Sequence, residues 1–280
     1  MHSFKKQVAI VVPIYKKNLT AGEKISMKHL IHFLGHYDKY FIAPPGLEFD
    51  APGFKMIRFH EKNFKSVRAY SKLLKTKEFY KAFKNYRFIL IYQLDALIFS
   101  DQLEKWCDKG YDYIGAPWIN SEIKKLTPKY NKEDHCGNGG FSLRNVEKSI
   151  AALKNGKKII PTATRKLGAL FSLFRELTND EKDLFKKREK NVRKYLWLIK
   201  EFLKNLPDVW YEYNEDIFWS FDATKYYPDF KVAPVEDGLK FAFEVGPKYC
   251  FKKNNNKLPF GCHAWEKYDK EFWLPYLLKK

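Results

Sequence analysis

The first residue able to do chemistry is a single carboxylate. Asp95 directly follows the largely apolar run 88–94. A carboxylate carried into a protein interior must be paired, hydrogen-bonded or bound to a metal, and ligands of open α/β sheets bind just beyond the carboxyl ends of the strands. We therefore expect Asp95 to contact a metal or a ligand, joined by Gln93 on the same side of the strand. The alternative is a structural carboxylate held by backbone amides or by an internal arginine such as Arg144.

The second segment is a glycine-rich stretch, Gly137-Asn138-Gly139-Gly140, which precedes a short strand-like run. Glycines permit positive φ and a close approach of a ligand to the backbone. Because an ordinary turn needs fewer of them, the pattern favours a ligand-contacting loop over a plain hairpin. Upstream, the segment 111–118 ends in an aromatic corner at Trp118, which can stack on a base or a sugar.

Two further segments carry titratable groups. Asn214 can cap a helix whose first turn holds Glu215 and Asp216. Acids there stabilise the helix dipole without any catalytic duty, but a carboxylate at the edge of a site can also accept the proton of an attacking hydroxyl. His263, in the segment 259–265, is either a metal ligand or diphosphate contact, or a hydrogen-bonded structural histidine.

A doubly wound α/β sheet is expected to position these groups. Strands and helices alternate in the order β, α, β, β, α, β over residues 7–15, 26–34, 40–43, 55–59, 66–85 and 88–95. The end of the first strand, with Pro13 and Tyr15, should line the same site as Asp95, because the carboxyl ends of parallel strands share one edge.

The whole chain, 1–280, is predicted to be one domain that contains a basic helical insertion at 149–208. The insertion has few turn signals and many lysines, and an apolar stripe runs from Leu184 to Phe202. Such a stripe packs on the protein's own core or faces a membrane or an acceptor.

The composition indicates an anionic partner. Lysine and arginine number 52 against 33 acidic residues, a net charge of +19, which suits nucleic acid, anionic lipid or a nucleotide diphosphate. The basic residues are scattered and form no nucleic-acid motif. The apolar run Val8–Ile14 is too short for a spanning or secretory segment. Four cysteines without a C-x-x-C pair predict reduced thiols and a cytosolic protein.

Five strings in this order together resemble a bacterial family of GT-A-like glycosyltransferases, long catalogued as a domain of unknown function and found with surface-polysaccharide genes. The strings are Tyr92–Asp95, Asp112–Trp118, Gly137–Arg144, Asn214–Asp216 and Pro259–His263. The likeness extends from Val8 to Trp265 and leaves out the insertion. It implies a GT-A-like, Rossmann-like fold: a mixed, mainly parallel sheet flanked by helices.

The resemblance also implies a reaction. Such an enzyme moves a sugar from a nucleotide-diphosphate donor to a hydroxyl of a glycan or lipid-linked acceptor in the synthesis of surface polysaccharide such as lipopolysaccharide. A direct displacement would invert the anomeric centre, and GT-A folds host both inverting and retaining enzymes. A divalent cation, Mn²⁺ or Mg²⁺, bridges the diphosphate. Asp95 matches the final acid of the family's Asp-x-Asp motif, Gln93 replaces the first acid, and His263 is the second expected metal ligand.

The remaining roles follow from the same resemblance. Glu215 or Asp216 is the expected catalytic base. The expected donor contacts are Pro13, Tyr15, Gln93, Asp95, Asn138, Gly139 and Gly140. The expected acceptor contacts are Trp118, Phe141 and Trp219.

The sequence also suggests where the protein is located in the cell, and it leaves two alternative functions. The excess charge suggests peripheral attachment to anionic lipid at the inner membrane face, with no nucleic-acid partner. A sugar-phosphate nucleotidyltransferase is an alternative, but the segment 12–17 lacks the glycine-rich, basic phosphate loop that such enzymes carry. A nucleic-acid-binding module would explain the charge and leave Asp95 and the glycine-rich stretch without a purpose.

Overall fold

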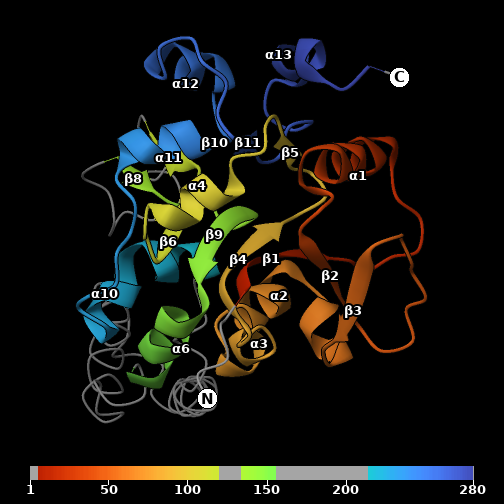
Figure 1. The fold of residues 1–280 in the computed structure, drawn as a ribbon, viewed down its shortest axis with the longest axis vertical. Coiled ribbons are helices and arrows are strands. Elements are labelled where there is room, and N and C mark those ends of the chain that lie inside the picture. Colours follow the sequence, from red (N-terminus) through yellow and green to blue (C-terminus); the bar gives the residue numbers. More distant parts are fainter. Residues whose placement is uncertain (1–5, 120–133, 156–213, 280) are drawn as a thin grey trace, which may run out of the picture.

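The centre of the protein is a six-stranded sheet with the order β3-β2-β1-β4-β9-β6 (Figure 1). The computed structural model describes residues 6–119, 134–155 and 214–279. The sheet strands are β1 (Lys6–Pro13), β2 (Asp38–Ala43), β3 (Phe54–Arg58), β4 (Tyr86–Tyr92), β6 (Tyr113–Gly115) and β9 (Phe141–Asn145). β1 to β4 are parallel, and β9 runs antiparallel to both β4 and β6. The expected fold class, a mixed and mainly parallel sheet, is confirmed.

Helices cover both faces of this sheet, so its strands are buried on two sides (Figure 1). One face packs against α1 (Ala21–Leu34), α4 (Leu103–Asp108) and α11 (Val235–Phe241). The other face packs against α2 (Val67–Leu73), α3 (Lys77–Lys81), α6 (Val146–Asn155) and α10 (Ala223–Tyr226). Along β1, Val8, Ile10 and Val12 point to the first layer, and Ala9 and Val11 to the second. This two-sided burial explains why the strands are continuous apolar runs.

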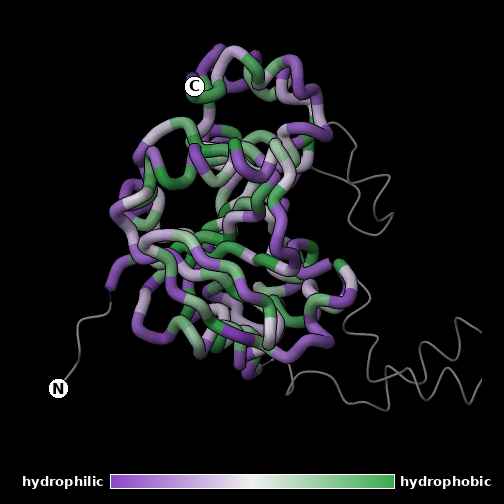
Figure 2. The backbone as a smooth tube through the Cα atoms, turned by 90° about the vertical axis from the view of Figure 1, so that its right-hand side faces the viewer, coloured by the Kyte–Doolittle hydropathy of each residue, from purple (hydrophilic) through white to green (hydrophobic). Residues whose placement is uncertain are grey.

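The C-terminal helices and a small sheet lie above the main sheet in Figure 1. Two small sheets, ordered β10-β11-β5 and β7-β8, are built from β5 (Leu97–Ile98), β7 (Pro117–Trp118), β8 (His135–Cys136), β10 (Ala242–Phe243) and β11 (Gly261–Cys262). The other helical elements are η1 (Glu61–Phe64), α9 (Glu215–Ile217), η5 (Phe218–Asp222), α12 (Pro247–Lys253), α13 (Lys270–Trp273) and η6 (Leu274–Tyr276). Figure 2 shows hydrophobic segments concentrated in the interior and hydrophilic segments toward the periphery.

The helix expected over 66–85 is two short helices. Ser66 caps α2 through the N–H of Ala69, and Thr76 starts α3 in the same way through the N–H of Phe79. Threonine favours such capping positions because its hydroxyl competes with the backbone ladder. The chain therefore ends one helix and starts another within three residues.

The strand before Asp95 is shorter than the sequence predicts. β4 ends at Tyr92, and residues 93–96 form a turn closed by the N–H of Ala96 donating to the carbonyl of Gln93 at 2.9 Å. The expectation that Gln93 and Asp95 share one face of a strand is therefore wrong. The turn arises because Leu97–Ile98 leave the main sheet to pair with β11.

Most of the predicted insertion lies outside the described residues. Its first residues, 149–155, belong to α6. Among the described helices, none combines the length and apolarity needed to cross a bilayer. Cys107, Cys136, Cys250 and Cys262 are free and buried.

Candidate active site

His263 gathers the polar groups at the end of β4. Its Nε2 lies 3.2 Å from an oxygen of Asp95 and 3.2 Å from the side-chain oxygen of Gln93. Its Nδ1 lies 2.9 Å from Glu244 Oε1. The side chain of Asp95 is 50% exposed, whereas those of His263 and Glu244 are each 11% exposed. Asp95 is therefore the group of this cluster that presents itself to solvent.

The charges of the cluster support one another. Burial alone would lower the pKa of His263, but the charge and hydrogen bond of Asp95 and the hydrogen bond of Glu244 raise this pKa to about 10. Burial also acts to raise the pKa of Asp95, yet His263 outweighs it and holds that pKa below its ordinary value. In the free protein at neutral pH, an imidazolium thus lies between two carboxylates and donates a hydrogen bond on each side.

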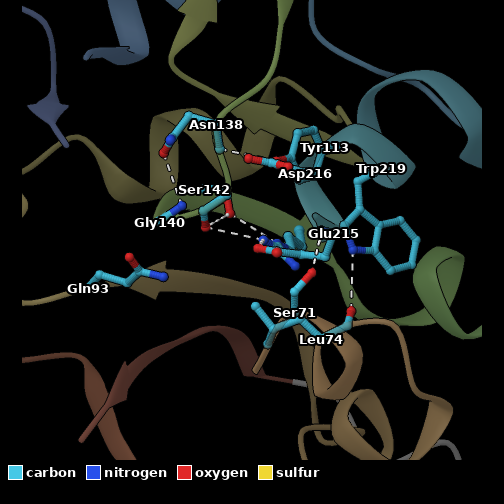
Figure 3. Close-up of polar contacts among 12 residues, drawn as sticks. Ser71, Leu74, Gln93, Tyr113, Asn138, Gly140, Ser142, Glu215, Asp216 and Trp219 are labelled. Atoms are coloured by element: carbon cyan, nitrogen blue, oxygen red, sulfur yellow. Dashed lines mark hydrogen bonds and ion pairs between the residues drawn. The ribbon is translucent and has the colours of Figure 1, made fainter. Parts of the chain in front are cut away.

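The glycine-rich stretch packs directly on this cluster. The side-chain amide of Asn138 donates to Glu244 Oε1 at 2.7 Å, and its oxygen accepts the N–H groups of Gly140 at 3.0 Å and Phe141 at 3.3 Å. A Cβ on Gly140 would lie 2.0 Å from His263 Nε2. Glycine is therefore required here for a close approach between backbone and imidazole. Figure 3 shows Asn138 and Gly140 above Gln93, the residue that follows β4.

Arg144 pairs with Glu215 and not with Asp95. Its Nη2 lies 3.2 Å from Glu215 Oε1, and the two side chains are 0% and 8% exposed. Gly139 lies against the pair, because a Cβ there would fall 2.3 Å from Glu215 Oε1. The structural alternative considered for Asp95, an internal pair with Arg144, thus describes Glu215 instead.

Asp216, the next residue, has a strongly perturbed carboxyl group. Burial and the neighbouring charges of Glu215 and Glu244 raise its pKa to about 7, against the lowering effects of the Ile217 N–H and of Arg144. The Ile217 N–H donates to Asp216 Oδ1 at 2.8 Å. A carboxyl that titrates near neutral pH is suited to accept a proton in a reaction.

The three aromatic residues expected to contact an acceptor lie inside the fold. Trp118, Phe141 and Trp219 are 5%, 0% and 0% exposed. The Trp219 ring packs edge-on against Tyr80, and its indole N–H donates to the carbonyl of Leu74 (Figure 3). Trp118 backs the glycine-rich stretch, since a Cβ on Gly137 would meet its ring at 2.3 Å. Their burial contradicts the expected acceptor contacts, because packing in the core explains why these residues are aromatic.

Pro13 and Tyr15 lie where the sequence predicts. Pro13 ends β1, which neighbours β4 in the sheet, and the Tyr15 side chain just beyond it is 62% exposed. Both residues are thus at the same edge of the sheet as Asp95. Tyr15 offers an exposed ring there on which a base can stack.

Glu244 is the site residue that the sequence reasoning missed. It follows β10, and the pairing of β10 with β11 brings it beside His263, whose N–H donates to the carbonyl of Phe243 at 2.9 Å. A signal existed: Glu244 is an acid at the end of a short apolar run, 241–243. The same rule singled out Asp95.

The donor set fits a divalent cation only in part. An Asp95 oxygen and His263 Nε2 lie 3.2 Å apart, and Glu244 on Nδ1 matches the carboxylate that commonly orients a metal-bound histidine. Within the described ranges, no group of three or more His, Cys, Asp or Glu is arranged to hold a metal. A cation held by two protein ligands would need substrate phosphates and water to complete its shell, as Mg²⁺ sites commonly do.

The sequence was compared with protein families and with curated proteins. A family model described as "Protein of unknown function (DUF5672)" matches residues 53–263, which include Asp95, Asp216, Glu244 and His263. A comparison with curated proteins returns no match.

Solved glycosyltransferases share the fold at low similarity. Galactosyltransferase LgtC, in complex with donor and acceptor sugar analogues, has a TM-score of 0.47 and 14% identity, covering 97% of each chain. GlyE of Streptococcus pneumoniae TIGR4 has a TM-score of 0.40 and 12% identity over 98% of this chain and 61% of its own. Core-mannan synthase A of Aspergillus fumigatus, in an Mn/GDP form, has a TM-score of 0.36 and 14% identity over 53% of this chain and 62% of its own. The chain thus spans about three fifths of the last two structures, and these scores leave the function to be argued from the geometry of the site.

Proposed function

We propose that this chain, which belongs to the DUF5672 family, is a glycosyltransferase that moves a sugar from a nucleotide diphosphate to a hydroxyl group. One observation carries the proposal. A half-exposed carboxylate, Asp95, lies beside His263 at the end of β4, and Glu244 joins His263 to Asn138 of the glycine-rich loop. Arg144 joins the same loop to Glu215, the neighbour of Asp216, whose carboxyl has a pKa near neutral. A charged anchor and a candidate proton acceptor on either side of one loop are the groups that this reaction requires.

The anchor would hold the donor. Asp95 and His263 would bind Mn²⁺ or Mg²⁺ together with the diphosphate, and Glu244 would orient the His263 ring. The cation, when bound, supplies positive charge that stabilises the departing diphosphate. Pro13 and Tyr15 at the end of β1 would contact the nucleoside, and Gln93, Asn138, Gly139 and Gly140 would line the sugar and phosphate side. The exposure of Tyr15 and the packing of Asn138 and Gly140 against Glu244 and His263 support these roles.

Asp216 would act as the base. The acceptor oxygen attacks the anomeric carbon and forms the new C–O bond while its proton passes to Asp216. The bond between the anomeric carbon and the phosphate oxygen breaks, and the nucleoside diphosphate leaves with the electron pair. This direct displacement inverts the anomeric centre. Asp216 is preferred over Glu215 because the Glu215 carboxylate is already engaged by Arg144 at 3.2 Å.

The acceptor class is a glycan or lipid-linked saccharide of surface-polysaccharide synthesis, reached at an anionic membrane surface. The net charge of +19 supports attachment of this kind, since each basic residue near anionic lipid contributes about 1 kcal/mol. Flotation with vesicles of anionic and of neutral lipid tests it. Equal recovery with both vesicles, or binding that does not weaken with salt, would contradict the attachment.

Donor binding is tested by thermal shift. UDP-, GDP-, CMP- and dTDP-sugars are added with and without Mn²⁺ to the wild type and to Asp95→Asn. We expect one donor to stabilise the wild type in a manner that depends on Mn²⁺, and Asp95→Asn to lose both effects. Asp101→Asn is the matched control, because that side chain is 45% exposed and likewise contacts a histidine. Equal stabilisation of Asp95→Asn and Asp101→Asn would refute the anchor.

Turnover tests the base. Release of nucleoside diphosphate by Asp216→Asn should fall by about 10²- to 10⁴-fold, the usual contribution of general-base catalysis, while donor-induced stabilisation persists. Wild-type turnover by this variant would remove the assignment.

A further inference from the structure

Arg144 is a buried arginine that donates hydrogen bonds through all three of its guanidinium nitrogens. Its guanidinium is 0% exposed and donates Nε–H to Ser142 Oγ at 3.0 Å and Nη1–H to the Tyr80 hydroxyl at 3.1 Å. Nη2 donates to two acceptors, the carbonyl of Gly139 and Glu215 Oε1, both at 3.2 Å. A buried cation is tolerated only when it is paired and hydrogen-bonded in this way. Arg144 thus joins the glycine-rich loop to the start of α9.

Glu215 is held on three sides. Arg144 binds its carboxylate, and Gly139 lies so close that a Cβ there would be 2.3 Å from the same oxygen. Its own backbone N–H donates to Ser71 Oγ at 2.7 Å, which ties the start of α9 to α2 (Figure 3). A carboxylate engaged like this has little freedom to meet an acceptor hydroxyl. It does fix the position of the next residue, Asp216.

We propose that Glu215 and Arg144 form a positioning pair, which anchors Asp216 beside the glycine-rich loop and sets the proton affinity of this base, while Glu215 itself takes no proton from the acceptor. The inference rests on the proposed function in one respect, the role of Asp216 as the base. The placement of Asp216 and its electrostatic dependence on the pair stand independently of the reaction.

The charges around Asp216 give the pair a measurable effect. Glu215 on the same helix and Glu244 after β10 raise the pKa of Asp216, whereas Arg144 on β9 lowers it. Lys75 after α2 and Tyr113 on β6 also lie within electrostatic reach of the Asp216 carboxyl. Replacing Glu215 by glutamine removes a like charge and leaves the charge of Arg144 unopposed. Both changes favour the ionised form of Asp216, so its pKa should fall.

The titration is followed by NMR on protein labelled with ¹³C at the aspartate carboxyl carbon, without any substrate. The resonance absent from Asp216→Asn identifies the group, and its midpoint in the wild type should be about 7. In Glu215→Gln the midpoint should fall by about one pH unit or more. Tyr80→Phe is the control, because it removes one hydrogen bond from Arg144 and no charge, and its midpoint should stay at the wild-type value. An unchanged midpoint in Glu215→Gln, or an equal shift in Tyr80→Phe, would overturn the proposal.

Turnover against pH separates this inference from the proposed function. Glu215→Gln should retain part of the wild-type turnover, with the acid limb of its profile shifted downward, whereas Asp216→Asn should lose activity at every pH. The reverse result, with Glu215→Gln inactive throughout and Asp216→Asn active, would make Glu215 the base. If no nucleotide sugar is turned over by the wild type, the proposed function fails, and the NMR titration still decides the positioning pair.

A second variant covers the case in which Glu215→Gln does not fold. Arg144→Lys keeps the positive charge but cannot bind Gly139 and Glu215 together. The midpoint of Asp216 should then remain near the wild-type value while turnover falls. Wild-type turnover in Arg144→Lys would contradict the positioning role.

Discussion

Gly140→Ala offers a severe test of how closely the loop packs on the charged cluster. The new Cβ would lie 2.0 Å from His263 Nε2 and 2.7 Å from Gln93 Oε1. Ordinary contact begins at 3.4 Å, so the imidazole must retreat by about 1.4 Å. The ring has little room to do so, because its Nδ1 is bound to Glu244 at 2.9 Å and its Nε2 lies 3.2 Å from Asp95.

The expected loss of stability has two parts. Forcing a methyl group into a packed interior costs about 1 to 3 kcal/mol. The displaced imidazolium also loses contact with Asp95, which we count at no more than about 1 kcal/mol because that carboxylate is half exposed. We expect a total loss of about 1 to 4 kcal/mol. At about 2 to 4 °C per kcal/mol for a chain of roughly this size, the Tm should fall by about 2 to 16 °C.

The assay combines thermal unfolding with addition of Mn²⁺ and the donor identified by the nucleotide-sugar panel. Gly140→Ala should melt earlier and gain less stabilisation from the ligands than the wild type. Gly238→Ala is the matched control, since its new Cβ would meet nothing closer than 3.1 Å and alanine favours its helix. Wild-type melting and wild-type ligand stabilisation in Gly140→Ala would refute the close packing of loop and imidazole.

Three further predictions concern the same structure. Tyr80→Phe should lower the free energy of unfolding by about 1 to 3 kcal/mol, since the Tyr80 hydroxyl donates to the carbonyl of Leu74 and accepts from Arg144. Urea unfolding that gives Tyr80→Phe the wild-type free energy would contradict this prediction. Burial lowers the pKa of His29 below 6.5, although a hydrogen bond to Ile98 acts to raise it. As the pH falls below 6.5, the unfolded chain takes up the proton before the folded chain does, so the free energy of unfolding should decline. A decline equally steep in His29→Gln would exclude this cause. Gln93→Asp should bind Mn²⁺ more tightly than the wild type, and it should melt earlier without Mn²⁺, because a third carboxylate then faces His263. If calorimetric titration gave the wild-type affinity for Mn²⁺, position 93 would lie away from the cation.

The periodicity and apolar runs of the sequence predicted the layers of the fold. Continuous runs such as Val8–Val12 and 88–92 correspond to β1 and β4, which are buried on both faces. The local breaks were harder to predict. β4 ends three residues before Asp95, because Leu97 and Ile98 pair with a strand more than 160 residues away in the chain. Pairing of that kind has no local signal.

In the candidate site, too, the sequence identified single residues but not the partners that the fold brings to them. Residues at the ends of apolar runs, such as Asp95, could be identified because an acid there needs a partner. The partners themselves depend on tertiary contacts: Arg144 meets Glu215, and Glu244 meets His263. Large aromatics were misassigned for a related reason. Trp219 in a polar motif suggested a ligand contact, but the helix that carries it turns the ring into the core.

The position of Glu244 gives a physical reason for glutamine at position 93. The imidazolium of His263 already has two carboxylates, Asp95 at 3.2 Å and Glu244 at 2.9 Å. A third acid at position 93 would add a negative charge where, in the proposed function, a diphosphate binds, and like charges in one site disfavour each other. The amide oxygen of Gln93 still accepts from Nε2 at 3.2 Å, so it provides the hydrogen bond without the charge. Under that proposal, Glu244 supplies the second carboxylate that an Asp-x-Asp motif would have at position 93, and it acts through the histidine instead of on a cation directly.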